Sequence, residues 1–299
     1  MHTRYHSSKL KIVTTFHRPK LDPSPSSYAQ VNRVQRQDAE QLLEEYSKII
    51  RWRNNGKENV LDIGCGPGDI TIDFVLPRMS RPIGKLVGVD VSEKMIKYAK
   101  RLYECEDVHF QTLDIENGDI DLFLKDYPEG FDHITSFYCL QWVRDQKKGM
   151  KNIYNLLKPA GDCFFAYPVK HAVFEIYEEL AKIPRWNTFM ASNCDFFASF
   201  INQDNAADTI YKFLKLTGFR YYNVEMVDKR MTYTGLDNIL GFITTINPII
   251  PKINNNERTE YLKDFLKIAA ELNVYREARN PSESEFATPY QLVVAYAVK

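Results

Sequence analysis

Three glycines alternate with other residues at Gly64, Gly66 and Gly68, and an acid, Asp69, follows them directly. The short apolar run 60–63 before them is typical of a buried parallel strand, and the residues after the glycines have a helical pattern. Glycines permit left-handed backbone conformations and let a ligand approach the bare main chain. Because nucleotide-like ligands bind between a strand end and a helix start in open α/β sheets, the stretch predicts such a site.

The spacing of these glycines differs from the pyrophosphate pattern G-x-G-x-x-G. An acid at Asp69 would repel a pyrophosphate and favours a ligand with a cationic amine. The second apolar run, 85–90, ends in Asp90, whose carboxylate can accept both hydroxyls of an unphosphorylated ribose. A ribose, an adenine and an amino-acid tail together describe S-adenosylmethionine. The predicted cofactor contacts in this region are Asp62, Gly64, Gly66, Asp69, Asp90 and Val91.

A third acid, Asp114, ends the apolar run 108–114 and is followed by Ile115. In this position Asp114 can accept from the exocyclic amine of an adenine while Ile115 covers the face of the ring. The alternative is that Asp114 caps a helix, and the residues alone favour neither. Both residues are therefore predicted cofactor contacts with an open alternative.

Apolar runs alternate with helical patterns along the middle of the chain. The expected strands are 60–63, 85–90, 108–114, 131–138 and 162–167, and the expected helices are 69–76, 93–103 and 146–157. This alternation predicts right-handed βαβ units and a parallel sheet, hence an α/β fold. A helix at 206–217, a strand at 221–227 and a last strand at 290–297 follow. The amphipathic stretch 29–52 predicts a long helix that can cover the ligand site as a lid.

The glycine turn with Asp62 and the spaced Asp90 resembles motif I of the class I S-adenosylmethionine-dependent methyltransferases. A glycine-rich turn by itself is equally compatible with an ordinary turn. The resemblance implies a Rossmann-like fold and a methyl donor as cofactor.

Further tracts narrow the resemblance to the insect juvenile hormone acid O-methyltransferases. These tracts are 35–39, 131–133, 137–145, 152–157 and 246–248, and the similarity runs from about residue 27 to the end. The resemblance implies a seven-stranded, mostly parallel sheet with an antiparallel last strand and a helical cap built from insertions. It also implies methylation of the carboxylate of farnesoic acid or juvenile hormone acid.

The family's contacts to the substrate carboxylate match Gln35 and Trp142 here, so the resemblance makes these the predicted catalytic pair. Most members have His where this chain has Gln141. Glutamine keeps a donor and an acceptor but does not titrate, so the pH response and the substrate preference are not fixed by the resemblance. Predicted substrate contacts are Gln35, Tyr138, Gln141, Trp142, Trp186 and Phe189.

A carboxylic acid with a pKa near ~4–5 is already a nucleophile at pH 7, so its methylation needs no general base. The indole N–H of Trp142 and the amide N–H of Gln35 are neutral donors that can orient such an anion without quenching it. The alternative for Trp142 is a core indole.

Two segments, about 171–205 and 235–280, do not fit the βα repeat and follow strands whose carboxyl ends face the ligand. They are predicted to form a cap over the second substrate. Their large aromatic side chains, Trp186 and Phe189 among them, exceed what the sheet needs and suggest an apolar substrate.

Composition sets the remaining expectations for the 299 residues. Lys plus Arg and Asp plus Glu both number 39, which gives no sign of a nucleic-acid or membrane partner, and no apolar run approaches the ~20 residues of a membrane span. The five cysteines form no C-x-x-C pair and indicate a reducing, cytoplasmic location, and no metal site is expected. Residues 1–27, basic and proline-containing, are expected to be a disordered extension (alternatively a transit peptide), and 28–299 a single domain.

Two other functions stay compatible with the sequence. One is a methyltransferase for another small carboxylic acid, and the other is a silent relative that binds a terpenoid acid. Turnover of a labelled methyl donor with a panel of acids separates them.

Overall fold

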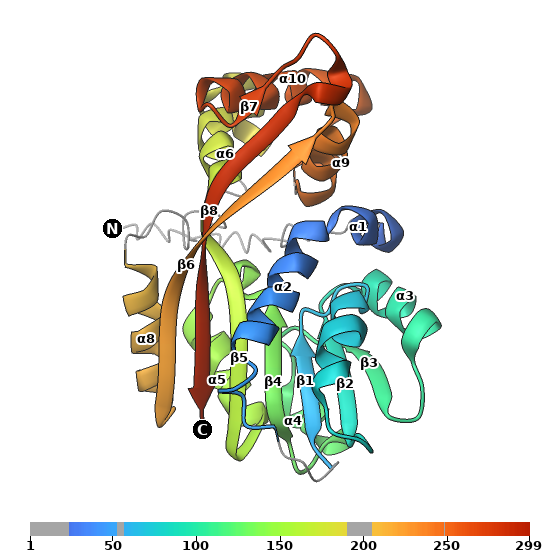
Figure 1. The fold of residues 1–299 in the computed structure, drawn as a ribbon, viewed down its shortest axis with the longest axis vertical. Coiled ribbons are helices and arrows are strands. Elements are labelled where there is room, and N and C mark those ends of the chain that lie inside the picture. The colour runs from blue at the N-terminus through green and yellow to red at the C-terminus, as the bar shows by residue number, and fades with distance from the viewer. Residues whose placement is uncertain (1–23, 53–56, 190–204, 248) are drawn as a thin grey trace, which may run out of the picture.

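The computed structural model describes residues 24–52, 57–189, 205–247 and 249–299, and its centre is one twisted sheet (Figure 1). The main path of the sheet runs in the order β3-β2-β1-β4-β5-β8-β6. The strands are β1 (Asn59–Ile63), β2 (Lys85–Asp90), β3 (Val108–Thr112), β4 (Phe131–Phe137), β5 (Leu157–His171), β6 (Tyr221–Thr234) and β8 (Glu285–Val298).

Strands β1 to β5 pair in parallel, whereas β8 lies antiparallel between β5 and β6. The expected seven-stranded sheet with an antiparallel last strand is confirmed. A short eighth strand, β7 (Tyr275–Arg276), also pairs with β8 and was not expected. The reversal of β8 lets the chain end inside the sheet.

Helices cover both faces of the sheet because adjacent strand residues point to opposite sides. Val60 and Leu61, neighbours on β1, belong to separate hydrophobic cores on the two faces. One face is covered by α2 (Arg33–Glu45), η1 (Thr71–Val75) and α3 (Glu93–Tyr103), and the other by α4 (Ile120–Asp126), α5 (Gln146–Leu156) and α8 (Ala206–Thr217).

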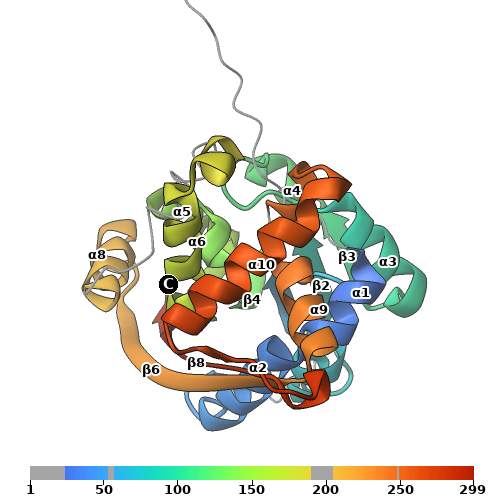
Figure 2. The same cartoon turned by 90° about the horizontal axis from the view of Figure 1, so that it is seen from above.

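A helical cap stands over the carboxyl ends of the parallel strands (Figures 1 and 2). It contains α6 (Ala172–Lys182), a helical stretch at 184–189, α9 (Leu236–Ile246), η4 (Ile250–Lys252), α10 (Asn255–Glu271) and η5 (Pro281–Glu283). The far halves of β6 and β8 extend up into it, so that the long strands join the cap to the sheet. None of the described helices is both long and apolar enough to span a membrane.

The predicted lid helix 29–52 is instead two helices, α1 (Pro25–Val31) and α2, separated at Asn32. Asn32 is buried, and its side-chain amide donates to Asp69 at 2.9 Å, so a contact with the glycine turn accompanies the break. Helix α1 begins at Pro25, and residues 1–23 lie outside the described residues, so the expected disordered extension 1–27 stays a prediction. The helix after the glycines is also irregular. It passes from η1 into the 3₁₀ turn η2 (Leu76–Arg78) at Pro77, which has no N–H to donate.

Candidate active site

The glycine turn after β1 lies against the residue that follows β4. Gly64 has a φ of +75°, and a Cβ there would come within 2.2 Å of the Cβ of Cys139, so only glycine fits. Gly66 has a φ of +54°, and the nearest atom to a Cβ there would be Cε1 of Tyr28 at 3.9 Å. Bare backbone at Gly66 therefore faces space under α1, as the predicted ligand approach requires. Tyr28 and Cys139 were not predicted, although Cys139 follows a strand end.

Asp69 stands at the helix end of this turn, with only one of its two oxygens paired. Its Oδ2 accepts from Asn32 at 2.9 Å and from Arg36 at 2.7 Å. Its Oδ1 is buried and has no hydrogen-bond partner among the described residues. A buried carboxylate oxygen of this kind is costly unless a donor arrives. The cationic amine of S-adenosylmethionine is a donor that fits this position.

Asp90, at the end of β2, supports the backbone of the turn. Asp90 Oδ2 accepts from the N–H of Gly66 at 3.0 Å and its Oδ1 accepts from the N–H of Ser92 at 2.8 Å. Burial raises the pKa of Asp90, although the backbone hydrogen bonds of Ser92 and Gly66 oppose the shift. Its contact with the ribose stays a prediction.

Asp62, a predicted cofactor contact, is held by hydrogen bonds to two threonines. Its two oxygens accept from the hydroxyls of Thr71 at 2.5 Å and Thr135 at 2.8 Å, and the side chain is buried. Burial raises the pKa of Asp62 to about 6 against the opposing hydrogen bonds of both threonines. Asp62 thus ties β1 to β4 and η1, and its contact with the cofactor stays a prediction.

Asp114 begins a turn and caps no helix, since the next helix, α4, starts at Ile120 and is capped by Asp119. Oδ1 of Asp114 accepts from the N–H groups of Glu116 at 2.9 Å and Asn117 at 3.2 Å, which makes a local turn. Ile115 is buried and Val91 is half-buried. The contacts of Val91, Asp114 and Ile115 with the cofactor stay predictions.

A cavity opens between the carboxyl ends of the strands and the cap, and it gathers four of the predicted substrate residues. Gln35 comes from α2, Tyr138 follows β4, and Gln141 and Trp142 belong to η3 (Leu140–Trp142). The cavity encloses about 570 Å³, part of it open to solvent. None of its other walls was among the predicted site residues, although Phe174 and Tyr177 lie in the aromatic segment expected to form the cap. These walls are mostly apolar: Val34, Pro168, His171, Val173, Phe174, Tyr177, Met231, Phe242, Ile246 and Tyr290.

Two glutamines present amide oxygens at this cavity. Oε1 of Gln35 and Oε1 of Gln141 are both buried and have no hydrogen-bond partner among the described residues. Gln141 donates its amide N–H to the carbonyl of Tyr138 at 2.9 Å, which fixes that amide. The side-chain amide of Gln35 makes no such hydrogen bond among the described residues. Rotation of this amide places its N–H donor at nearly the position of its oxygen acceptor. Gln35 is therefore the better donor to an anion.

Tyr138 shows its ring to the cavity while its hydroxyl points elsewhere. The phenol donates to Asp38 at 2.5 Å, and the phenol of Tyr290 donates to the same carboxylate at 2.6 Å. Tyr138 also has a φ of +54°, which is uncommon for a residue with a Cβ. Both tyrosines thus supply walls and no free hydroxyl to a substrate.

His171 is the titratable ring of the cavity wall. Its Nδ1 accepts from the N–H of Val173 at 3.0 Å, and burial lowers the pKa of His171 to about 4. The ring is therefore neutral at pH 7. No Lys, Arg, Asp or Glu lines the described cavity.

Comparison with known proteins decides the family. The methyltransferase domain family matches residues 54–223. Juvenile hormone acid O-methyltransferase of Drosophila melanogaster is 36% identical over 92% of this chain and 91% of its own length, and that of Bombyx mori is 31% identical over 91% and 96%. This chain belongs to the juvenile hormone acid O-methyltransferase family.

Solved structures agree on the fold. The YcgJ protein of Bacillus subtilis aligns with a TM-score of 0.51 at 16% identity over 87% of this chain and 98% of its own. Phosphoethanolamine N-methyltransferase 2 of Haemonchus contortus gives 0.51 at 15% identity over 92% of this chain and 56% of its own. Both identities are too low to carry more than the fold.

Membership makes the protein an S-adenosylmethionine-dependent methyltransferase. The residues present fit that cofactor. Gly66 offers open backbone, and Oδ1 of Asp69 offers a buried acceptor to its amine.

Two predicted substrate residues of this family member do not line the cavity. Trp186 is fully buried in the cap, where its indole N–H donates to Asp264 at 2.8 Å and its ring meets Tyr261 edge-on at 5.3 Å. Phe189 packs against the same core. An aromatic-rich segment can serve either core or pocket, and both side chains pack here against the core of the cap. Their contacts with the substrate stay predictions.

Proposed function

We propose that the protein transfers a methyl group from S-adenosylmethionine to the carboxylate of a sesquiterpenoid acid, farnesoic acid or juvenile hormone acid. The names of the Drosophila and Bombyx relatives support the substrate class. The observation that carries the proposal is the cavity, which combines mostly apolar walls with the polar groups of Gln35, Gln141 and Trp142.

The chemistry of the wall suits an acceptor that needs no base. His171 is neutral at pH 7 with its Nδ1 occupied, and the phenols of Tyr138 and Tyr290 both donate to Asp38. A carboxylic acid is ionised at that pH and is nucleophilic without help. An alcohol or a phenol would need a proton acceptor that the described wall does not offer.

Catalysis then consists mainly of positioning. Bound S-adenosylmethionine supplies an electrophilic methyl group. Trp142 and Gln35 offer neutral donors that orient the carboxylate, and neither donor neutralises it. Orientation of this kind can lower a barrier by roughly 7–11 kcal/mol.

The cap accounts for the tail of the substrate. Phe174 from α6 and Phe242 and Ile246 from α9 face the cavity, whose volume of about 570 Å³ lies within the ~300–1,000 Å³ usual for small-molecule sites. An isoprenoid chain buries only apolar surface there. The partner is thus a small molecule, and the free thiols of Cys65, Cys105, Cys139 and Cys163 favour a cytoplasmic setting.

The test is turnover with methyl-labelled S-adenosylmethionine against four acceptors: farnesoic acid, its epoxy acid, a short branched unsaturated acid and farnesol. We expect labelled methyl esters from the two long acids, much slower reaction of the short acid and none of the alcohol. Absence of ester from both long acids would refute the proposal. Equal turnover of the short acid would show that another small acid is the substrate.

A further inference from the structure

Asp38 is a buried carboxylate that belongs neither to the cavity wall nor to the glycine turn. It lies on α2, is 4% exposed, and accepts from two phenols, Tyr138 at 2.5 Å and Tyr290 at 2.6 Å. Both of those rings line the substrate cavity, whereas Asp38 does not. Asp38 therefore meets the cavity only through its two partners.

The two phenols come from distant parts of the chain. Tyr138 follows β4 and Tyr290 lies on β8, so Asp38 joins α2 to two strands of the sheet. Tyr138 is further held by its N–H, which donates to the carbonyl of Ala166 at 2.9 Å. Its left-handed backbone needs surroundings that fix it, and Asp38 is one of them. Rotation of either phenol away from Asp38 would bring a hydroxyl or a gap into the cavity.

Lys229 of β6 offsets the charge of Asp38. Nζ of Lys229 lies 3.6 Å from Oδ1 of Asp38 and also donates to Gln41 at 2.7 Å. The Lys229 side chain is only 11% exposed. This pairing matters because an unbalanced carboxylate behind the wall would repel an anionic substrate.

Helix α2 is also held at the glycine turn, where the cofactor is expected to bind. Arg36 donates to Asp69 at 2.7 Å, and Asn32 just before the helix donates to the same carboxylate. Gln35, three residues before Asp38, reaches the cavity from the same helix. The position of Gln35 thus depends on the contacts of the helix with Asp69 at one end and on those of Asp38 at the other.

We propose that Asp38 is a positioning residue for the acceptor acid. It fixes the orientation of the Tyr138 and Tyr290 rings and the position of Gln35 without touching the substrate. The inference rests on the proposed function, because it assigns these walls to a carboxylic acid. It makes Asp38 matter for the acid and not for the methyl donor.

The test is Asp38→Asn, which keeps size but gives one acceptor oxygen and no charge. We expect kcat/KM for farnesoic acid to fall roughly tenfold to hundredfold, the scale of one or two charge-assisted hydrogen bonds. The Kd of S-adenosylmethionine should stay within about twofold. The factor by which kcat/KM falls should be the same for a short acid, because Gln35 and the residues around it hold the carboxylate and not the tail.

Tyr290→Phe is the second variant, since it removes one hydroxyl and keeps the ring. It should show the same pattern at smaller size. Asp121→Asn, on the exposed face of α4, is the matched control and should behave as the wild type.

Each other outcome overturns the inference. Improved KM for the acid in Asp38→Asn would mean that the carboxylate acts only as an opposing charge. An equal loss of S-adenosylmethionine affinity would mean a general structural role, and wild-type kinetics in both variants would mean no role. A wild type that esterifies no acid would instead refute the proposed function, and the inference with it.

Discussion

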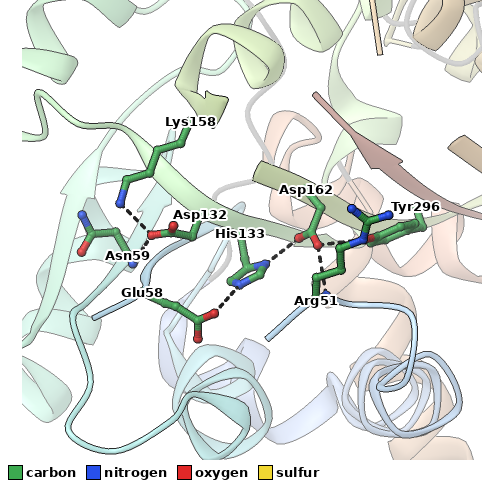
Figure 3. Close-up of polar contacts among 8 residues, drawn as sticks. All are labelled: Arg51, Glu58, Asn59, Asp132, His133, Lys158, Asp162 and Tyr296. Carbon is green, nitrogen blue, oxygen red and sulfur yellow. Dashed lines mark hydrogen bonds and ion pairs between the residues drawn. The ribbon is translucent and has the colours of Figure 1, made fainter. Parts of the chain in front are cut away.

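Buried charged and polar groups are arranged differently at the two ends of the parallel strands. At the amino ends of the strands, charged groups face each other: His133 on β4 lies 2.6 Å from Asp162 and 3.0 Å from Glu58, and Lys158 lies 2.7 Å from Asp132 (Figure 3). At the carboxyl ends, polar groups face the ligand spaces. There Oδ1 of Asp69 and Oε1 of Gln35 and Gln141 are buried without partners among the described residues.

The oxygens beside the glycine turn and the cavity are thus placed to accept from a ligand, whereas the paired charges at the amino ends form a structural joint. The joint ties distant parts of the chain, because Asp162 also accepts from Tyr296 at 2.9 Å and from the backbone of Arg51 at 3.2 Å (Figure 3). Substitutions at the amino ends of the strands should therefore change stability, and substitutions at the carboxyl ends should change activity.

The largest effect is expected at the joint. His133→Ala leaves Glu58 and Asp162 buried without their shared cation, and should lower the free energy of unfolding by about 3–5 kcal/mol. At a temperature where the variant is folded, kcat and both KM values should stay near normal. Chemical denaturation and steady-state kinetics measure the two.

His109→Ala is the control, a histidine of the edge strand β3 that is not buried, and should change stability by less than about 0.5 kcal/mol. If His133→Ala were as stable as this control, the joint would have no structural weight.

The next effect is at the glycine turn. Gly66→Val places a branched side chain at a φ of +54° and in the space over the turn, and should weaken S-adenosylmethionine binding by at least about a hundredfold. Global stability should fall far less than in His133→Ala. Calorimetric titration that finds normal affinity in the folded variant would show that the turn has only a structural role.

The smallest effect concerns pH. Burial lowers the pKa of His133, but the hydrogen bonds and charges of Asp162 and Glu58 outweigh it and raise that pKa above its ordinary value. A raised folded pKa means that the stabilisation is complete below the unfolded value of about 6.5 and is lost as pH rises through the folded one.

The difference in unfolding free energy between wild type and His133→Gln should therefore be largest near pH 6 and shrink toward pH 9. A difference that grows with pH would contradict the bridged imidazolium.

Local patterns predicted the parts of the fold that local chemistry controls. The helix at 93–103 forms with those bounds because Ser92 caps it by accepting from Met95, and the helix at 206–217 ends at Gly218 with a φ of +109°. The glycine turn and the meeting of Gln35, Tyr138, Gln141 and Trp142 were likewise predicted from sequence and resemblance.

Other features were missed because they depend on distant contacts. Asp38 and Tyr290 are 252 positions apart, so no spacing links them. The break at Asn32 accompanies a contact with Asp69, and the burial of Trp186 reflects its bond to Asp264. Periodicity reports which face of an element is apolar, but it does not report which partner covers that face.

The most direct test of the substrate site at the carboxyl ends of the strands is a double-mutant cycle on Gln35 and Trp142 with farnesoic acid. Gln35→Ala and Trp142→Phe each remove one donor to the same anion, and each should lower kcat/KM by about 10–100-fold with near-normal cofactor affinity. Because both act on one carboxylate, the double variant should lose less than the product of the two single losses. Full activity of both single variants would contradict the account, and would mean that Trp142 is a core indole and that the acid is held elsewhere in the cap.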